Sequence, residues 1–451
     1  MGFTSLVFLV FFPIVYLVYL LMPPKGRAFW LLIASYGFCI SFGLKYAVIL
    51  LLSTLGTWLA GIAAEKRQGE AEGRWITGAA VLLHVLLLCF FKYNGSHPVL
   101  PVGLSFYTFQ AIGYLADVYR GTVRAERNLI RFGLFQAFFP KLVQGPIERS
   151  QELLGQIREL EKKKLLDPER MREGMLLLLW GLFQKLVIAD RAAVAVNAVY
   201  GQFGAFGGGE ILLATLLYAF QLYCDFAGYT NMARGIAGLC GIELTENFRR
   251  PYLAVSVREF WRRWHISLSS WLRDYVYIPL GGSRNGKLRR YMNVMLTFLV
   301  SGIWHGTGFH FLLWGCMHGA VQLAETAWEK LPRILRWCLT FGFINASWMV
   351  FRVNSLGDLR GMLKLLVTDM RFRDPAGMGL GGLEWLLLVL GLFLAAGKDL
   401  LNEKGFGIRK WLARRGFFVR LLVYTALLSG IVVFGVYGAA YDTGGFLYTQ
   451  F

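Results

Sequence analysis

Two histidines beside long apolar segments have the right chemistry to move a proton. His265 ends an Arg-Arg-Trp-His sequence that begins at Arg262. His305 lies forty residues later, directly after Trp304, inside an apolar run. A neutral imidazole has a pKa near working pH, so it can act as a general base toward a hydroxyl group. Ionisable residues close to membrane segments are usually kept for function. The pattern favours proton transfer at His305, whereas an incidental interfacial histidine explains His265 equally well.

A structural role is the alternative for each histidine in this region. His305 could hydrogen-bond a neighbouring carbonyl and tie helices together. The glycines around it, Gly302 and Gly306, permit close approach of a helix or of a ligand. His318 follows thirteen residues after His305, and an ideal helix would turn it about 140° away. Gly306 and Gly308 between the two histidines are expected to break such a helix. Both a structural and a functional role stay open for His318.

Carboxylates near apolar segments are a second group of candidates, because such residues are rare and usually paired. Asp225 lies centrally in an apolar segment, and we expect it to face a polar cavity. Asp190 is adjacent to Arg191 near a predicted helix end, which favours a structural ion pair. Lys185 is long enough to reach toward the membrane surface.

Several function classes lack their sequence signals. A serine-nucleophile elbow, a phosphate-binding loop and a zinc-protease motif are all missing from a supporting context. The six cysteines contain no CxxC pair, so neither a metal site nor a disulfide framework is indicated. The net charge of +19 suggests nucleic acid on a soluble protein. On an apolar chain it is better explained by basic residues that collect in cytoplasmic loops.

The composition predicts an all-α polytopic membrane protein. Of the 451 residues, 56% are hydrophobic and only 17% are charged. Continuous apolar runs of roughly 20 residues recur, which is the length needed to cross the hydrocarbon layer as a helix. About 10–12 transmembrane helices are expected, and the candidate spans are 3–22, 28–43, 45–64, 76–92, 100–118, 174–199, 210–240, 291–308, 310–328, 337–352, 383–398 and 419–439.

Three segments do not resemble ordinary spans. Prolines and a glycine break the apolar segment Phe132–Gly145, which we expect to be re-entrant. The stretch Glu148–Arg172 has mixed charges with apolar residues at helical spacing, typical of a surface amphipathic helix. Arg249–Arg290 is too polar to span and predicts short helices at the cytoplasmic interface. Its aromatic residues between Trp261 and Tyr277 are expected at headgroup depth.

The combined motifs resemble the membrane-bound O-acyltransferase family, and within it the branch that O-acetylates exported polysaccharides such as alginate. Each motif is weak alone, but their joint occurrence in family order between about residues 100 and 320 is specific. The matching segments are Phe139–Ile147, Tyr223–Tyr229, Glu246–Phe248, Arg250–Tyr252, Arg258–Leu268, Leu272–Gly282 and Trp304–Gly306.

This resemblance implies a helical bundle around a central tunnel, entered from the cytoplasm by an acyl thioester. The chain would form one domain over 1–451, with N-terminal spans at 1–120, a catalytic core at 130–330 and C-terminal spans at 337–451. The invariant histidine of the family maps onto His305, and a second tunnel histidine maps onto His265. Possible supporting residues are His318, Asp225, Trp304, Arg262, Arg263, Asp274 and Gln144.

The expected reaction is acyl transfer, with acetyl-CoA as cosubstrate and with no bound cofactor or metal. His305 would activate the acceptor hydroxyl, His265 would orient the partners, and cations within 249–290 would meet the CoA phosphates. The expected partners are an exported polysaccharide, a separate extracytoplasmic acetyltransferase and membrane lipids, at a bacterial cytoplasmic membrane.

Two alternatives stay open. The first is D-alanyl transfer from an acyl-carrier protein to teichoic acid. Relatives with that activity usually lack a segment like Ile278–Gly282, which favours acetylation. The second is a transporter of a lipid-linked sugar or of an acyl donor, because buried histidines and aspartates suit a transporter too. The lack of a clear internal repeat disfavours it.

Overall fold

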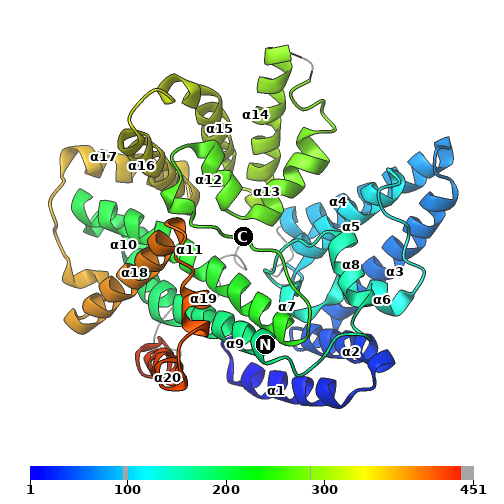
Figure 1. The fold of residues 1–451 in the computed structure, drawn as a ribbon. Helices are drawn as coiled ribbons and strands as arrows, with labels where there is room; N and C mark the ends of the chain where they lie inside the picture. The colour runs from blue at the N-terminus through cyan, green and yellow to red at the C-terminus, as the bar shows by residue number, and fades with distance from the viewer. Residues whose placement is uncertain (95–99, 285, 438–451) are drawn as a thin grey trace. The chain divides into compact units, whose positions relative to one another are not determined.

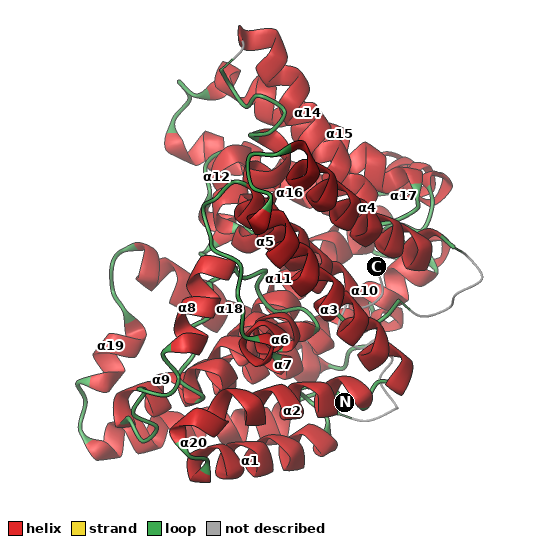
Figure 2. Ribbon diagram, turned by 90° about the vertical axis from the view of Figure 1, so that its right-hand side faces the viewer, coloured by secondary structure: helices red, strands yellow, loops and turns green. Residues whose placement is uncertain are grey.

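Helices are the only regular secondary structure in the described part of the chain, as Figures 1 and 2 show. The computed structural model describes residues 1–94, 100–284 and 286–437. The predicted all-α class is confirmed within these ranges.

The chain forms two compact units. Unit 1 contains residues 1–178 and 229–246, and unit 2 contains residues 179–228 and the chain from 247 onward. Two helices, α9 (Pro168–Leu182) and α11 (Gly208–Leu239), contribute residues to both units. The expected single membrane domain over 1–451 is not tested by this division and stays a prediction.

Unit 1 consists of the N-terminal helices together with parts of α9 and α11. Its other helices are α1 (Leu6–Leu21), η1 (Pro24–Gly26), α2 (Arg27–Ile40), α3 (Leu44–Lys66), α4 (Ala71–Tyr93), α5 (Leu104–Tyr119), α6 (Leu129–Ala137), α7 (Phe139–Leu142) and α8 (Ser150–Arg158). The core lies around α5, whose residues are buried on every face over most of its length.

Unit 2 contains the chain from the end of α9 through the first part of α11, and then the C-terminal half. Its elements are η2 (Phe183–Ala189, a π-helix), α10 (Asp190–Gly201), η3 (Phe203–Ala205), η4 (Pro251–Leu253), α12 (Val257–Arg263), α13 (Ile266–Leu272), η5 (Arg273–Tyr277, a π-helix), α14 (Gly286–His305), α15 (Phe309–Ala324), η6 (Glu325–Trp328), α16 (Arg333–Arg352), α17 (Leu356–Thr368), η7 (Ala376–Met378), α18 (Gly382–Glu403), α19 (Ile408–Ala413) and α20 (Phe417–Phe434).

Glycines let helices pack at short range within each unit. In unit 1, a Cβ atom on Gly235 of α11 would lie 2.5 Å from the carbonyl oxygen of Gly174 on α9. In unit 2, a Cβ atom on Gly228 would lie 2.9 Å from the carbonyl oxygen of Gly181. Real side chains do not fit at such separations, so glycine sets the approach of α9 and α11.

Within the described ranges, five helices are long and apolar enough to cross a membrane, namely α3, α4, α11, α16 and α20. The helix α1 is apolar but shorter. Each predicted span coincides with a helix or a continuous helical run, with ends shifted by a few residues; residues 438 and 439 of the last span lie outside the described ranges. The prediction of a polytopic membrane protein is therefore confirmed.

The three unusual segments form short helices. The apolar segment 132–145 breaks at Phe138, between α6 and α7, as its prolines predict. The single amphipathic helix expected over Glu148–Arg172 is wrong. Instead α8 ends at Arg158 and α9 begins at Pro168, because Asp167 accepts hydrogen bonds from the backbone of Glu169 and Arg170 and so starts a new helix.

The polar stretch 249–290 contains short helices and no span, as predicted. The expected headgroup position needs correction for two of its aromatic residues, however. Trp264 is 2% exposed and Trp271 is 6% exposed, so both are buried inside unit 2 and do not face lipid headgroups. An interfacial aromatic belt and a buried aromatic cluster have the same composition, and sequence alone does not separate them.

Candidate active site

His265 occupies a sharp turn between α12 and α13. Its φ angle is 43°, in the left-handed region that residues other than glycine rarely adopt. Asn247 stabilises the turn through two hydrogen bonds. Its backbone oxygen accepts one from Ile266 N at 3.0 Å, and its side-chain oxygen accepts one from Ser267 N at 3.0 Å. Such strain persists only where the surroundings impose it, and it is concentrated at functional sites.

Ion pairs fix the end of α12 just before this turn. Arg263 donates to both carboxylate oxygens of Glu403 at 3.0 Å, and to Glu259 at 2.6 Å. These hydrogen bonds lower the pKa of Glu403. The backbone of Arg263 also accepts from Arg249 N at 2.8 Å. Arg263, a predicted supporting residue, therefore acts on the position of His265 from outside the cavity described below.

His305 is the last residue of α14. The chain turns at Gly306–Gly308 and continues into α15, and the two helices pack tightly through glycines. A Cβ atom on Gly302 would lie 2.5 Å from the carbonyl oxygen of Phe311. The helix break expected at these glycines is thus present. It places His305 at a helix end, where the imidazole is 3% exposed.

The two histidines line one small cavity within unit 2. Its volume is about 10 Å³, which is room for roughly one water molecule. Its wall consists of Leu222, Trp261, Trp264, His265, Leu268, His305, Trp314, Trp348 and Phe351. Residues forty positions apart in sequence therefore face the same buried space, which we call the histidine cavity.

Aromatic rings hold both imidazoles in place. The ring of His305 lies 5.0 Å from Trp314 and 5.0 Å from Phe351, nearly perpendicular to each. Trp304 packs against the same imidazole at 4.6 Å. The ring of His265 lies 4.7 Å from Phe226, also edge to face. The surrounding rings are apolar, so burial lowers the pKa of His265 to about 3 and keeps its imidazole neutral.

His318 does not line the histidine cavity. Its Nδ1 accepts a hydrogen bond from Trp261 Nε1 at 3.1 Å, so its proton is assigned to Nε2. The Nε2–H then donates to Ser347 Oγ at 3.0 Å, and Ser347 donates onward to the carbonyl oxygen of Ile344 at 2.8 Å. His318 is therefore a positioning residue for the indole of Trp261, which is part of the cavity wall.

Asp225 belongs to a buried ion cluster. Lys185 Nζ lies 2.7 Å from Asp225 Oδ1 and 2.7 Å from Asp190 Oδ1, and all three side chains are at most 7% exposed. Lys185 lies in the π-helix η2, which widens the helix locally. Asp225 is thus paired with Lys185 and does not line the histidine cavity. Asp190 was expected to pair with Arg191 but pairs with Lys185. Neighbouring residues on a helix point in different directions, so the partner of Asp190 lies one turn earlier.

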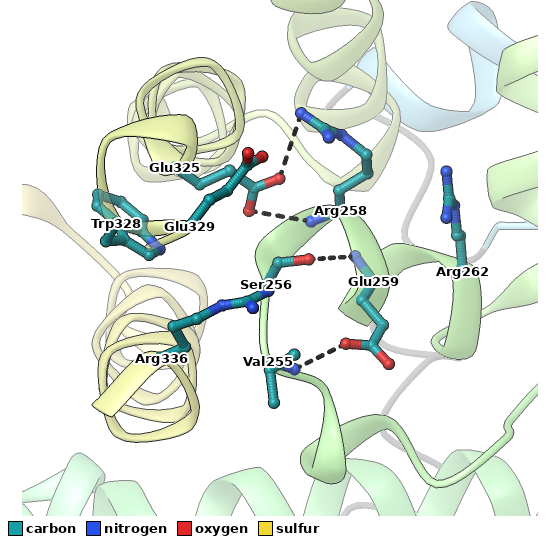
Figure 3. A pocket seen from close by; sticks show the side chains of 9 residues that line it. All are labelled: Val255, Ser256, Arg258, Glu259, Arg262, Glu325, Trp328, Glu329 and Arg336. Atoms are coloured by element: carbon teal, nitrogen blue, oxygen red, sulfur yellow. Dashed lines mark hydrogen bonds and ion pairs between the residues drawn. The ribbon is translucent and has the colours of Figure 1, made fainter. Parts of the chain in front are cut away.

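A second, larger cavity lies at the start of α12, and Figure 3 shows it from close by. Its volume is about 370 Å³, and its lining includes Arg258, Arg262 and Arg336. Glu325 reaches into it and accepts from the backbone of Val257 at 2.7 Å, while its other oxygen lies 3.5 Å from Arg258. The negative charge of Glu325 therefore lies at the N-terminus of α12, where the helix dipole is positive.

Charges in this second cavity are unequally paired. Glu325 is matched by Arg258, and Glu259 is matched by Arg263. Among the described residues, Arg262 and Arg336 form no ion pair, and Glu329 is the remaining acid in the lining. After pairing, two guanidinium groups face one carboxylate, so the cavity favours an anionic group.

The other predicted supporting residues lie elsewhere. Asp274 pairs with its neighbour Arg273 at 2.7 Å in η5 and is not part of the histidine cavity. Gln144 lies in unit 1, is 1% exposed, and its side-chain amide has no hydrogen-bond partner among the described residues. Over the same residues, no group of three His, Cys, Asp or Glu side chains is arranged to hold a metal ion.

Sequence reasoning missed most of the cavity wall. Trp314, Trp348 and Phe351 lie in apolar helices and look like any buried aromatic residue. No sequence pattern marks these residues. They come close to His305 only after the chain reverses direction at Gly306–Gly308. Glu325 and Glu403 were also missed, although each is an acid at the end of an apolar helix.

Comparison with known proteins identifies the family. The model of the membrane-bound O-acyltransferase family matches residues 124–352. The chain is 37% identical over 385 residues to a protein of Pseudomonas syringae pv. tomato named "Probable alginate O-acetylase", an alignment that covers 79% of this chain and 73% of the relative. It is 32% identical over 417 residues to a Helicobacter pylori peptidoglycan O-acetyltransferase, covering 81% and 79% of the two chains.

A more distant relative has a different acyl group in its name. The chain is 27% identical over 288 residues to a teichoic acid D-alanyltransferase of Streptococcus thermophilus, covering 60% of this chain and 69% of the relative. The names of the three relatives refer to the transfer of acetyl or D-alanyl groups, in connection with alginate, peptidoglycan or teichoic acid.

Proposed function

Because the chain belongs to the membrane-bound O-acyltransferase family, we propose that it passes acetyl groups from cytoplasmic acetyl-CoA across the membrane for O-acetylation of an exported polysaccharide. The chain is a multi-pass membrane protein and an O-acyltransferase. The donor, the direction and the acceptor are the proposal. The observation that carries its chemistry is the shared position of His265 and His305 on one buried cavity.

In the proposed reaction, His305 removes the proton from the acceptor hydroxyl. The hydroxyl oxygen attacks the thioester carbonyl carbon, the carbon–sulfur bond breaks, and the departing thiolate takes the proton back from His305. General-base help of this kind contributes roughly 10²–10⁴-fold. His265 is neutral because of its burial, so its N–H can donate a hydrogen bond to the carbonyl oxygen, where negative charge develops.

The histidine cavity must widen during turnover, since about 10 Å³ does not accommodate an acetyl thioester. Most of the wall residues are aromatic, so we expect rotation of their rings to open the cavity. Two of these rings belong to Trp261 and Phe351. Trp261 packs against Phe298 of α14 and Trp314 of α15, and Phe351 packs against His305 and against Phe311 of α15.

We place the phosphates of CoA at the second cavity. Its unpaired guanidinium groups, Arg262 and Arg336, suit a phosphate, and its volume of about 370 Å³ is large enough for part of a nucleotide. The cavity lies on α12, the helix that leads to His265. The acetyl group would then pass to an exported polysaccharide through a separate extracytoplasmic acetyltransferase, at a bacterial cytoplasmic membrane.

D-alanyl transfer from an acyl-carrier protein is the second candidate, and the relative from Streptococcus thermophilus supports it. It needs the same histidine chemistry with a different thioester. A transporter with no chemistry of its own is disfavoured, because the family and the relatives are named for acyl transfer.

The test is acyl transfer in proteoliposomes. Purified wild type and His305→Ala are supplied with labelled acetyl-CoA outside or inside the vesicles, together with an extracytoplasmic acceptor fraction. Label transfer by the wild type, reduced about 10²-fold or more in the variant, is expected. A matched control is His84→Ala, which removes a buried histidine of unit 1 that contacts Thr57 at 2.8 Å.

The outcomes separate the candidates. Normal transfer by His305→Ala would remove His305 from the mechanism. Transfer from a D-alanyl carrier protein and none from acetyl-CoA would select the second candidate. Equal loss in His305→Ala and His84→Ala, with both proteins less stable, would indicate a folding defect, and His305→Gln would then be measured in their place.

A further inference from the structure

A basic turn between α18 and α20 has no part in the histidine cavity or in the second cavity. Residues 404–420 contain no acid, and their cations are Lys404, Arg409, Lys410, Arg414, Arg415 and Arg420. A third cavity of about 460 Å³ lies within this turn. It is lined by Gly405, Phe406, Gly407, Lys410, Trp411, Arg414 and Arg415.

The backbone of this turn is well fixed. Gly405 has a φ angle of 83°, which requires glycine, and Phe406 N donates to the carbonyl oxygen of Leu401 at 2.9 Å. The short helix α19 is anchored by Leu412, which is 4% exposed. Arg415 lies over the ring of Trp411, 4.5 Å from its centroid. The cations therefore surround a preformed space.

The three cations that line the cavity, Lys410, Arg414 and Arg415, have no carboxylate partner among the described residues. Glu403, the nearest acid in sequence, is engaged by Arg263. Three like charges around one space repel one another, and a bound anion relieves that repulsion.

The neighbouring helix indicates where this anion comes from. The turn leads directly into α20, which is long and apolar enough to cross a membrane and has only 6% of its apolar window buried. At its start, Phe418 is 82% exposed and Leu422 is 70% exposed. Basic clusters immediately beside a transmembrane helix attract anionic lipids, at about 1 kcal/mol per cation near the surface.

We propose that the cavity of Lys410, Arg414 and Arg415 binds the phosphate headgroup of an anionic membrane lipid, whose acyl chains lie along the start of α20. Trp411 and Phe406 would contact the glycerol region, where amphipathic rings are favoured. This lipid site is independent of the acyl-transfer proposal, because it shares no residue with either of the other cavities.

The experiment measures lipid retention by the purified full-length protein. The protein is incubated in detergent with equal amounts of phosphatidylglycerol and phosphatidylcholine of identical chains, and bound lipid is counted by native mass spectrometry. Wild type is expected to retain phosphatidylglycerol preferentially. Combined substitution Lys410→Gln, Arg414→Gln and Arg415→Gln is expected to weaken that retention at least about 10-fold, and Lys410→Gln alone is expected to weaken it partially.

A matched control removes the same charge from another exposed run, through Lys162→Gln, Lys163→Gln and Lys164→Gln. It should retain phosphatidylglycerol like the wild type. The proposal is overturned if the first triple variant retains the lipid fully, or if both triple variants lose it equally. It is also overturned if glycerophosphoglycerol, the headgroup without acyl chains, binds as tightly as the lipid, since the site would then serve a free anion.

Discussion

The indole nitrogen of Trp261 donates a hydrogen bond to Nδ1 of His318 at 3.1 Å, and this bond joins the wall of the histidine cavity to α15. His318 has a second hydrogen bond, to Ser347 on α16, so its ring is held from both sides. One residue thus connects three helices behind the cavity. A histidine in such a position shapes a site without touching what is bound there.

Replacing His318 tests this positioning role. His318→Leu leaves the Trp261 N–H without its acceptor, which costs about 1–3 kcal/mol of stability, and we expect acyl transfer to fall about 10-fold. His318→Asn keeps an acceptor near the position of Nδ1 and should recover most of the rate with an unchanged pH profile. Thermal unfolding and kcat are measured for each variant. A stable His318→Asn protein that is as inactive as His305→Ala would show that His318 is catalytic.

The left-handed backbone at His265 predicts a difference in stability between a glycine and an alanine variant at this position. His265→Gly and His265→Ala both remove the imidazole, so neither should transfer acyl groups efficiently. Left-handed geometry costs a residue with a Cβ atom about 1–2 kcal/mol, whereas the extra chain entropy of glycine costs about 0.5–1 kcal/mol. We expect His265→Gly to be the more stable variant by up to about 1 kcal/mol in denaturant unfolding. An alanine variant more stable than the glycine variant would mean that the turn is not strained.

The arginines of the second cavity can be tested with a modified donor. We expect Arg262→Gln and Arg336→Gln to raise KM for acetyl-CoA by about 10-fold and to leave kcat nearly unchanged, because each removes one charge-assisted contact to phosphate. The effect should shrink with 3′-dephospho-acetyl-CoA, which lacks one phosphate. Arg284→Gln, at an exposed arginine outside the cavity, is the control. Unchanged KM in both cavity variants would place the donor phosphates elsewhere.

The ion pair of Arg263 and Glu403 predicts a pH dependence of stability. Hydrogen bonds from Arg263 lower the folded-state pKa of Glu403, so the stabilisation is present above the unfolded pKa and is lost as pH falls through the folded value. Glu403→Gln should therefore be less stable than wild type at pH 7. The difference should begin to shrink as pH falls below the ordinary glutamate pKa of about 4.3, and it should disappear below the lowered folded-state pKa. Thermal unfolding over this pH range measures it. A difference that stays constant with pH would show that packing, and not charge, is what Glu403 contributes.

The sequence predicted the helices well because length and apolarity decide them. The spans at 45–64 and 76–92 match α3 and α4 within a few residues, since continuous apolar runs have few other stable forms in a membrane. The glycines after His305 correctly predicted a helix break. The identity of the two principal histidines came from the resemblance to a family, and the structure adds that both face one cavity.

Tertiary partners could not be predicted in the same way. Lys185 and Asp225 are forty residues apart, so no local pattern links them, whereas the adjacent Arg191 suggested a false partner for Asp190. Trp264 was placed at headgroup depth because an aromatic residue beside arginines is typical of a membrane interface. Its burial depends on the turn at His265, whose left-handed backbone has no sequence signal of its own.

The small size of the histidine cavity bears on how easily water could hydrolyse the proposed thioester donor. A thioester is a high-energy compound, and any water beside an activated base would hydrolyse it without acylating the acceptor. A space of about 10 Å³ between aromatic rings has room for no more than about one water molecule before the donor arrives. Under the proposed function, we therefore expect the aromatic wall to limit hydrolysis of the donor, because the rings would move only when a hydroxyl acceptor displaces them.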